Sequence, residues 1–285
     1  MQWSVSEPLP ITLPSKSPTS MAAVPTVAVL SMKGGVGKTT VTLGLASAAA
    51  ARRMSVLVID LDPQGNTTMG LAVDAPAFTM TDVLADARPG VAQDALATSP
   101  WGESVHVLAA NRALEHRNQP EGAYSAQRLR IALGSIPNRY DLVLIDCPPS
   151  LGEMTRNALH AATDAVIVTE PSYFSLHGAE EALGAVRLIQ STTNPGLRTV
   201  SIVLNKARPT VAEHRHRIAE LQDGYGSLVN PVVIPERLAI AQAEGAGIPI
   251  HAWESPAGAE LAKLFDALLD QYLPRRPIFR WGPFT

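Results

Sequence analysis

The fold is decided by one short stretch of the sequence, Lys33-Gly34-Gly35-Val36-Gly37-Lys38-Thr39-Thr40. An apolar run of the kind that forms a strand, Thr26 to Leu30, precedes it, and an Ala-rich stretch from Lys38 to Arg53 follows with the composition of a helix. Strand, glycine-rich loop and helix in this order form a phosphate cradle, because the loop N–H groups and the positive end of the helix surround the anion. The stretch therefore predicts a phosphate-binding loop in an α/β fold.

The residues of this loop have distinct chemical roles. Lys38 is expected to reach the β- and γ-phosphates, and the Thr39 hydroxyl is expected to bind Mg²⁺. The glycines allow backbone conformations and close approaches that a Cβ would obstruct. The general pattern places a glycine five positions before Gly37, but this chain has Met32 there and a second lysine, Lys33, directly after it.

Outside the loop, apolar runs that predict strands alternate with stretches that predict helices. The further strands are expected at 55–59, 105–108, 140–145, 165–168, 200–204 and 232–234, and the further helices at 80–85, 175–190, 210–222 and 256–272. This alternation favours a doubly wound α/β fold, in which helices cover both faces of a mostly parallel sheet. We expect a single domain over 26–273, a disordered Pro-rich tail over 1–25 and a short C-terminal tail over 274–285.

The composition limits the classes of function. Hydrophobic residues make up 46% of the 285 residues and charged residues 17%, which is typical of a globular chain. The formal net charge of −3 gives no strongly basic footprint, so any contact with nucleic acid has to come from a local patch. Cys147 is the one cysteine, which excludes cysteine-based iron–sulfur sites within one chain and favours a reduced cytoplasm.

Carboxylates stand directly after two of the expected strands. Asp146 follows the apolar run 142–145, and Asp60 and Asp62 follow the run 55–59. Ligands of open α/β sheets gather at the carboxyl ends of the strands, so these acids are expected to lie near the phosphate loop. Nucleotide hydrolysis in such a cradle needs a carboxylate for the Mg²⁺ shell and a group that orients the attacking water. The three acids are the candidates for these roles.

The loop with Met32 and Lys33 resembles the deviant Walker A motif of the ParA/MinD family of P-loop ATPases, in particular of the ParA/Soj-type partition ATPases. The strings Asp60-Leu61-Asp62-Pro63-Gln64-Gly65-Asn66 and Asp146-Cys147-Pro148-Pro149-Ser150 resemble the family's second and third motifs. The resemblance covers nearly all of 26–273. It implies a P-loop NTPase fold and a slow ATPase that uses ATP and Mg²⁺.

The resemblance also implies a role for each matching residue. Lys33 reaches the partner's phosphates in a nucleotide-sandwich dimer, Lys38 acts on its own nucleotide, and Asp62 positions or activates the water. Asp60 supports either Mg²⁺ or the lysine, and Asp146 acts as the Walker B aspartate. The nucleotide is expected at Lys33, Gly34, Gly35, Val36, Gly37, Lys38, Thr39, Thr40, Asn205 and Pro235, and Mg²⁺ at Thr39, Asp60 and Asp146. The asparagine reads the adenine edge, because an amide both donates and accepts, and the segment that ends at the proline wraps the base.

For a member of this family we expect a homodimer when ATP is bound, an adaptor of the ParB kind that stimulates hydrolysis, and a cytoplasmic, nucleoid-associated location. Such proteins bind DNA non-specifically through basic residues on one face, for which the candidates are Arg208, Arg215, Arg217 and Arg237. The alternative is a MinD-like or cargo-positioning ATPase that acts on a membrane surface or a protein cargo. Three prolines in 274–285 prevent a regular helix there, which disfavours a membrane partner. A metabolic P-loop enzyme is a third hypothesis.

Overall fold

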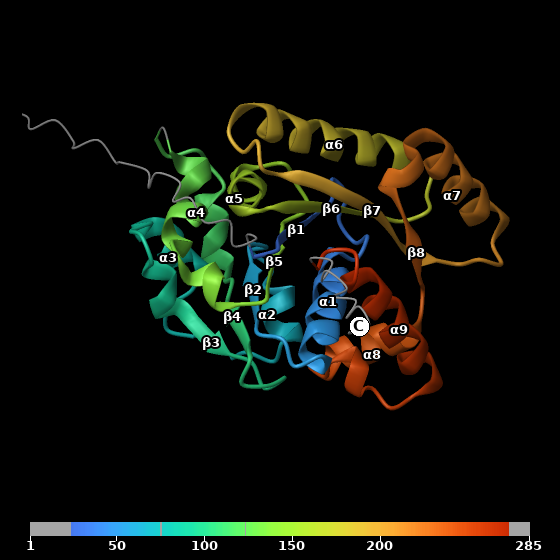
Figure 1. Ribbon diagram of the computed structural model, residues 1–285, viewed down its shortest axis with the longest axis horizontal. Coiled ribbons are helices and arrows are strands. Elements are labelled where there is room, and N and C mark those ends of the chain that lie inside the picture. Colours follow the sequence, from blue (N-terminus) through green and yellow to red (C-terminus); the bar gives the residue numbers. More distant parts are fainter. Residues whose placement is uncertain (1–23, 75, 123, 274–285) are drawn as a thin grey trace, which may run out of the picture.

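Eight strands form one sheet in the computed structural model, which describes residues 24–74, 76–122 and 124–273 (Figure 1). The strands are β1 (Thr26–Leu30), β2 (Val56–Asp60), β3 (Leu96–Thr98), β4 (Val105–Leu108), β5 (Leu142–Asp146), β6 (Asp164–Thr169), β7 (Arg198–Ala207) and β8 (Val229–Pro235). Their order is β3-β4-β2-β5-β1-β6-β7-β8, and β3 alone pairs antiparallel, with β4. Because the other strands run parallel, the loops that follow them meet at one edge of the sheet.

Helices cover both faces of the sheet. They are α1 (Lys38–Ala51), α2 (Asn66–Gly70), α3 (Met80–Asp86), α4 (Arg128–Leu133), α5 (Glu153–Ala161), α6 (Ser175–Thr192), α7 (Ala212–Tyr225), α8 (Leu238–Gly245) and α9 (Pro256–Leu269). One hydrophobic core lies between one face of the sheet and the helices α1, α8 and α9 (Figure 1). A second core lies between the other face and the helices α3, α4, α5, α6 and α7. In β1, Val27 and Val29 belong to the first core and Ala28 and Leu30 to the second, because successive strand residues point to opposite faces. None of the described helices has the length and apolar character to cross a bilayer.

The predicted doubly wound α/β fold is confirmed, and the ends of the predicted elements differ from the observed ends by at most three residues. The structure adds β3, α2, α4, α5 and α8, which have three to nine residues each and are too short for a clear hydrophobic period. The predicted tails over 1–25 and 274–285 lie outside the described residues, apart from residues 24 and 25. The division of the chain into these tails and one domain over 26–273 stays a prediction.

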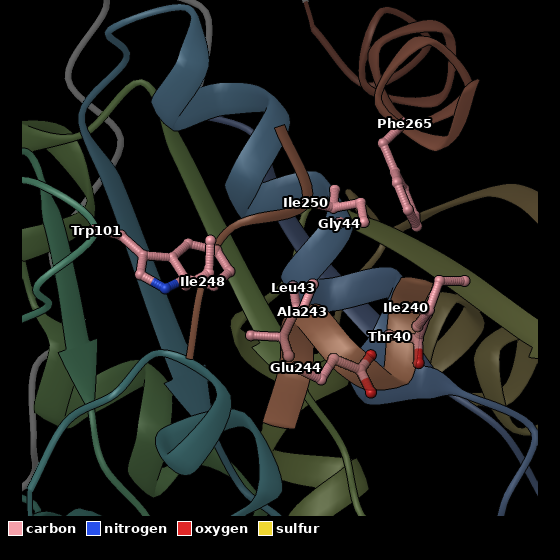
Figure 2. Close-up of a pocket in the computed structure, with 10 residues that line it drawn as sticks. All are labelled: Thr40, Leu43, Gly44, Trp101, Ile240, Ala243, Glu244, Ile248, Ile250 and Phe265. Carbon is pink, nitrogen blue, oxygen red and sulfur yellow. The ribbon is translucent and has the colours of Figure 1, made fainter. Parts of the chain in front are cut away.

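The helix that begins at the phosphate loop, α1, packs closely on α9. Gly44 of α1 faces the ring of Phe265 (Figure 2), and a Cβ at position 44 would lie 2.1 Å from that ring. A cavity of about 20 Å³ lies beside this contact, with Leu43 and Trp101 in its wall. The Trp101 Nε1–H donates to the Gly247 carbonyl at 2.8 Å. The two helices therefore approach so closely that no side chain fits at position 44.

Candidate nucleotide site

The loop between β1 and α1 has the backbone shape of an anion cradle. Gly35 and Gly37 have φ angles of 79° and 92°, a left-handed conformation that residues with a Cβ rarely adopt. Gly37 is the N-cap of α1, and within the described residues no side chain caps this helix end. The first N–H groups of α1 can therefore donate to an anion, which the positive end of the helix also attracts.

A cavity of about 650 Å³ opens beside this loop, a volume that suits a nucleotide. The residues predicted for the nucleotide site that line it are Gly34, Gly35, Gly37, Lys38, Thr39, Thr40, Asp62, Asn205 and Pro235. Arg237, which is predicted to contact DNA, also lines this cavity. Asp60, Asp146 and Val36 are buried and do not line it, and Lys33 lies outside it. The structure thus brings the phosphate loop, the second motif and the ends of β7 and β8 to one cavity.

Oxygen atoms suited to Mg²⁺ meet where β1 and β5 end side by side. Asp146, the last residue of β5, accepts a hydrogen bond from the Thr39 hydroxyl at 2.8 Å and another from Thr67, both on Oδ2. Its Oδ1 is buried and has no partner among the described residues. Mg²⁺ prefers hard oxygen ligands and usually takes one or two from the protein beside phosphate oxygens and water. Thr39 and Asp146 therefore fit a Mg²⁺ site.

Asp60 and Asp62 have different environments, although they are two residues apart. Asp60 is fully buried; its Oδ2 accepts from the N–H and hydroxyl of Thr68 at 2.9 and 2.8 Å, and its Oδ1 accepts from the Asp62 N–H at 3.1 Å. Asp62 lines the cavity, and its Oδ1 accepts from the Gln64 N–H at 3.0 Å. Asp60 thus holds the loop that carries Asp62, while Asp62 faces the nucleotide cavity.

Burial changes the protonation of the two acids that end β2 and β5. Asp60 and Asp146 are register partners across these strands, and each is at most 1% exposed. Burial and the charge of Asp146 raise the pKa of Asp60 to about 7. Burial raises the pKa of Asp146 to about 6, against the hydrogen bonds from Thr67 and Thr39 and the charge of Lys38. A divalent cation here would favour the ionised carboxylates, so the charges of the site complement Mg²⁺.

The ends of β7 and β8 supply the opposite wall of the cavity. Asn205 is buried, and its Nδ2 donates to the Val36 carbonyl at 2.8 Å, whereas its Oδ1 has no partner in the described part of the chain. A Cβ at Gly37 would lie 2.0 Å from this Nδ2, so the amide reaches the loop only because residue 37 is glycine. Pro235 ends β8 and lines the cavity beside it. Asn205 and Pro235 thus form the wall of the cavity opposite the phosphate loop.

The cavity is also lined by charged residues to which the sequence motifs give no role, namely Lys206, Glu236 and Glu244. Lys206 has a positive φ of 55°, and its Nζ donates to the Gly35 carbonyl at 2.5 Å. Glu244 of α8 turns its carboxyl group towards Thr40 (Figure 2); burial raises the pKa of Glu244, and a hydrogen bond from Thr40 opposes this shift. Lys206 directly follows Asn205 and could have been found from the sequence. Glu244 could not, because α8 was not predicted.

The two lysines of the loop lie in different environments. Lys38 is 6% exposed and lines the cavity. The Lys33 side chain is 53% exposed and forms an ion pair with Glu170, the residue that follows β6. Lys38 therefore faces the nucleotide cavity of its own chain, whereas Lys33 lies on the outer side of the loop.

Two of the four candidate DNA-binding arginines lie on α7, and the other two lie in the loops after β7 and β8. Three of the four are engaged in ion pairs. The pairs are Arg208 with Glu236, Arg217 with Glu213 and Glu220, and Arg237 with Glu260. Arg215 is exposed and donates to the carbonyls of Pro209 and Thr210 at 2.9 and 3.1 Å. Within the described residues, no carboxylate lies in ion-pair distance of Arg215. It is therefore the candidate whose charge is least compensated.

Comparisons with known proteins show the family of this chain. A family model described as "AAA domain" matches residues 24–199. The sporulation initiation inhibitor protein Soj of Bacillus subtilis is 33% identical over 241 residues, which cover 82% of this chain and 94% of Soj. The chromosome-partitioning ATPase Soj of Thermus thermophilus is 31% identical over 257 residues, which cover 87% of this chain and 96% of that protein.

A solved structure of a similar protein contains a nucleotide and magnesium. Cobyrinic acid a,c-diamide synthase from Mycobacterium smegmatis, with bound ADP and magnesium, matches with a TM-score of 0.73 and 27% identity over 87% of this chain and 95% of that chain. Its ligands correspond to the nucleotide and the cation that the cavity and the Thr39–Asp146 pair suit. The protein is an ATPase with ATP and Mg²⁺ as its ligands, and it belongs to the ParA/Soj group of the ParA/MinD family of deviant Walker A ATPases.

Proposed function

We propose that this chain is a DNA segregation ATPase that works as an ATP-bound sandwich dimer. The dimer binds DNA without sequence preference, and an adaptor of the ParB kind stimulates hydrolysis and releases it. The observation that carries the proposal is the position of Lys33, which lies outside its own nucleotide cavity with a 53% exposed side chain. A cation so placed can serve the phosphates of a second protomer.

Each residue of the cavity has a role in this proposal. The N–H groups at the start of α1 and the Lys38 ammonium bind the phosphates, and Thr39 and Asp146 hold Mg²⁺. Mg²⁺ neutralises negative charge on the phosphate oxygens. Asp62, on the cavity wall, positions the attacking water, and Asp60 fixes the loop that carries Asp62. Lys33 of each protomer stabilises the charge that develops on the partner's nucleotide.

ATP can act as a switch in this arrangement. A ligand shifts an equilibrium only by its difference in affinity for the two states. In a sandwich dimer, the γ-phosphate supplies this difference, because it meets a second lysine that the monomer does not provide. Hydrolysis removes the contact, and the dimer then separates.

Arg215 is the residue we assign to DNA contact. It is exposed on α7, and its charge is not paired with a carboxylate of the described residues. With a chain charge of −3, such a contact gives weak, salt-sensitive binding to phosphates rather than recognition of one site. Non-specific binding of this kind would place the protein on the nucleoid.

DNA binding measured with each nucleotide tests the proposal. Fluorescence anisotropy of labelled duplexes of two unrelated sequences is recorded with Mg²⁺ and ATP, ADP or AMP-PNP, at low and raised salt. We expect equal binding to both sequences with ATP and AMP-PNP, weak binding with ADP and loss at raised salt. Lys33→Ala is the matched control, which we expect to bind nucleotide but not DNA. Binding that needs no nucleotide contradicts the proposal, and ATP-dependent dimers without DNA affinity favour a membrane or protein cargo instead.

A further inference from the structure

The ion pair between Lys33 and Glu170 joins two neighbouring strand ends. Lys33 lies in the loop after β1, and Glu170 directly follows β6, which pairs with β1 in parallel register. The pair therefore lies at the edge of the sheet to which the nucleotide cavity opens. Nothing in the three nucleotide-binding motifs accounts for Glu170.

Hydrogen bonds from nearby serines hold the backbone of Glu170 in place. Its carbonyl accepts hydrogen bonds from the Ser172 N–H at 2.8 Å and from the Ser175 hydroxyl. The Ser175 N–H in turn donates to the Ser172 carbonyl at 3.0 Å, where α6 begins. The Glu170 side chain is 25% exposed, against 53% for Lys33. The carboxylate, which extends from a backbone held by these bonds and is the less exposed partner, thus offers Lys33 a contact within its own protomer.

While Lys33 pairs with Glu170, it cannot contact the phosphates of a partner protomer. The lysine does not line its own nucleotide cavity, and among the described residues Glu170 is the one carboxylate within ion-pair distance of it. An ammonium that is held by a carboxylate of its own protomer cannot extend to a phosphate on a second protomer at the same time. The two contacts of Lys33 therefore compete.

We propose that Glu170 is a positioning residue that holds Lys33 within its own protomer until two ATP-bound protomers associate. This role rests on the proposed function, from which it takes the contact between Lys33 and the partner's phosphates. An ion pair of this exposure favours the paired arrangement by up to about fivefold. A symmetric dimer breaks two such pairs, so the loss of the carboxylate strengthens association by up to about 25-fold.

The first test measures dimer formation by analytical ultracentrifugation of the full chain with Mg²⁺ and AMP-PNP. We expect Glu170→Gln to dimerise at lower protein concentrations than the wild type, by up to about 25-fold. The difference should narrow at raised salt, because salt weakens the pair in the wild type. Glu181→Gln removes one carboxylate charge from α6, where Glu181 faces His177, and should behave like the wild type. Equal or weaker dimerisation of Glu170→Gln than of the wild type overturns the role of Glu170.

The second test uses the nucleotide-free monomer, so it does not depend on the dimer. Unfolding midpoints of the wild type, Lys33→Ala, Glu170→Gln and the double variant form a double-mutant cycle. We expect the two single shifts to be non-additive, because each substitution removes the same ion pair. Additive shifts overturn the ion pair itself. A wild type that does not dimerise with AMP-PNP overturns the proposed function, whereas a dimerising wild type with additive shifts overturns only the role of Glu170.

Discussion

Removing the charge of Asp146 should stabilise the protein that holds neither nucleotide nor Mg²⁺. Asp60 and Asp146 are buried register partners, and their pKa values are raised to about 7 and about 6 from 3.8. A pKa that is raised in the folded state means that the protonated form is favoured by folding. The stability gained in this way is fully present below the pKa of the unfolded state. It is lost as pH rises through the pKa of the folded state. At neutral pH the wild type therefore bears the cost of these buried charges.

The size of the effect follows from the pKa of Asp146. A rise of about two pKa units corresponds to roughly 3 kcal/mol at neutral pH. In Asp146→Asn, the amide oxygen can still accept the bonds that Thr39 and Thr67 donate to Oδ2, but the new NH₂ group replaces an Oδ1 without a partner, at a cost of about 1 kcal/mol. We expect a net gain of about 1–2 kcal/mol. For a chain of this size, that raises Tm by roughly 2–8 °C.

Thermal unfolding between pH 4 and 8, with and without Mg²⁺ and AMP-PNP, tests this expectation. The difference in Tm between Asp146→Asn and the wild type should grow as pH rises through about 4 to 7 without ligand. It should reverse with ligand, because only the wild type then gains stability from binding. Burial lowers the pKa of His251, so this residue makes the stability of both proteins rise with pH. Because both proteins contain His251, its contribution drops out of the difference in Tm between them. A variant with a lower Tm than the ligand-free wild type at pH 7, or the same pH profile, would refute the reasoning.

Four further outcomes are expected. Lys38→Ala should lower ATP affinity by at least about 10-fold in calorimetry, because the buried ammonium faces the cavity. Asp62→Ala should retain AMP-PNP-induced dimers but lose turnover by about 100-fold or more in a phosphate-release assay; normal turnover would exclude its water-positioning role. Gly44→Val should lower stability by about 1–3 kcal/mol in urea unfolding, because its side chain overlaps the Phe265 ring. Arg215→Ala should weaken binding to all DNA sequences alike and reduce the salt slope by about 1; an unchanged slope would exclude this contact.

The parts of the site that follow directly from strands could be predicted from the sequence. Asp146 closes an apolar run, and parallel strands place their carboxyl ends at one edge, so its position beside Thr39 follows from the pattern. Asn205 was assigned through the resemblance to the family, and it also lines the cavity. The resemblance gave Asp60 and Asp62 different roles, but it did not predict that Asp60 is buried and bound by Thr68, because these contacts depend on the folded chain.

Contacts between distant parts of the chain were beyond prediction. Glu170 lies 137 positions from Lys33 in the sequence, and no local pattern links the two. The pairing of Arg208 with Glu236 across 28 positions is of the same kind, since it requires β7 and β8 to lie side by side. These contacts decide which charges are available to a partner, so a count of basic residues overstates the basic surface.

The close approach of Gly37 and Asn205 has a consequence for the evolution of this loop. The amide nitrogen of Asn205 occupies the space that a Cβ at position 37 would fill, 2.0 Å away. A substitution at 37 alone would collide with the amide, and a shorter residue at 205 alone would release the Val36 carbonyl. Neither position can drift freely while the other stays the same. Among functional descendants of this chain, positions 37 and 205 should therefore change together or remain unchanged.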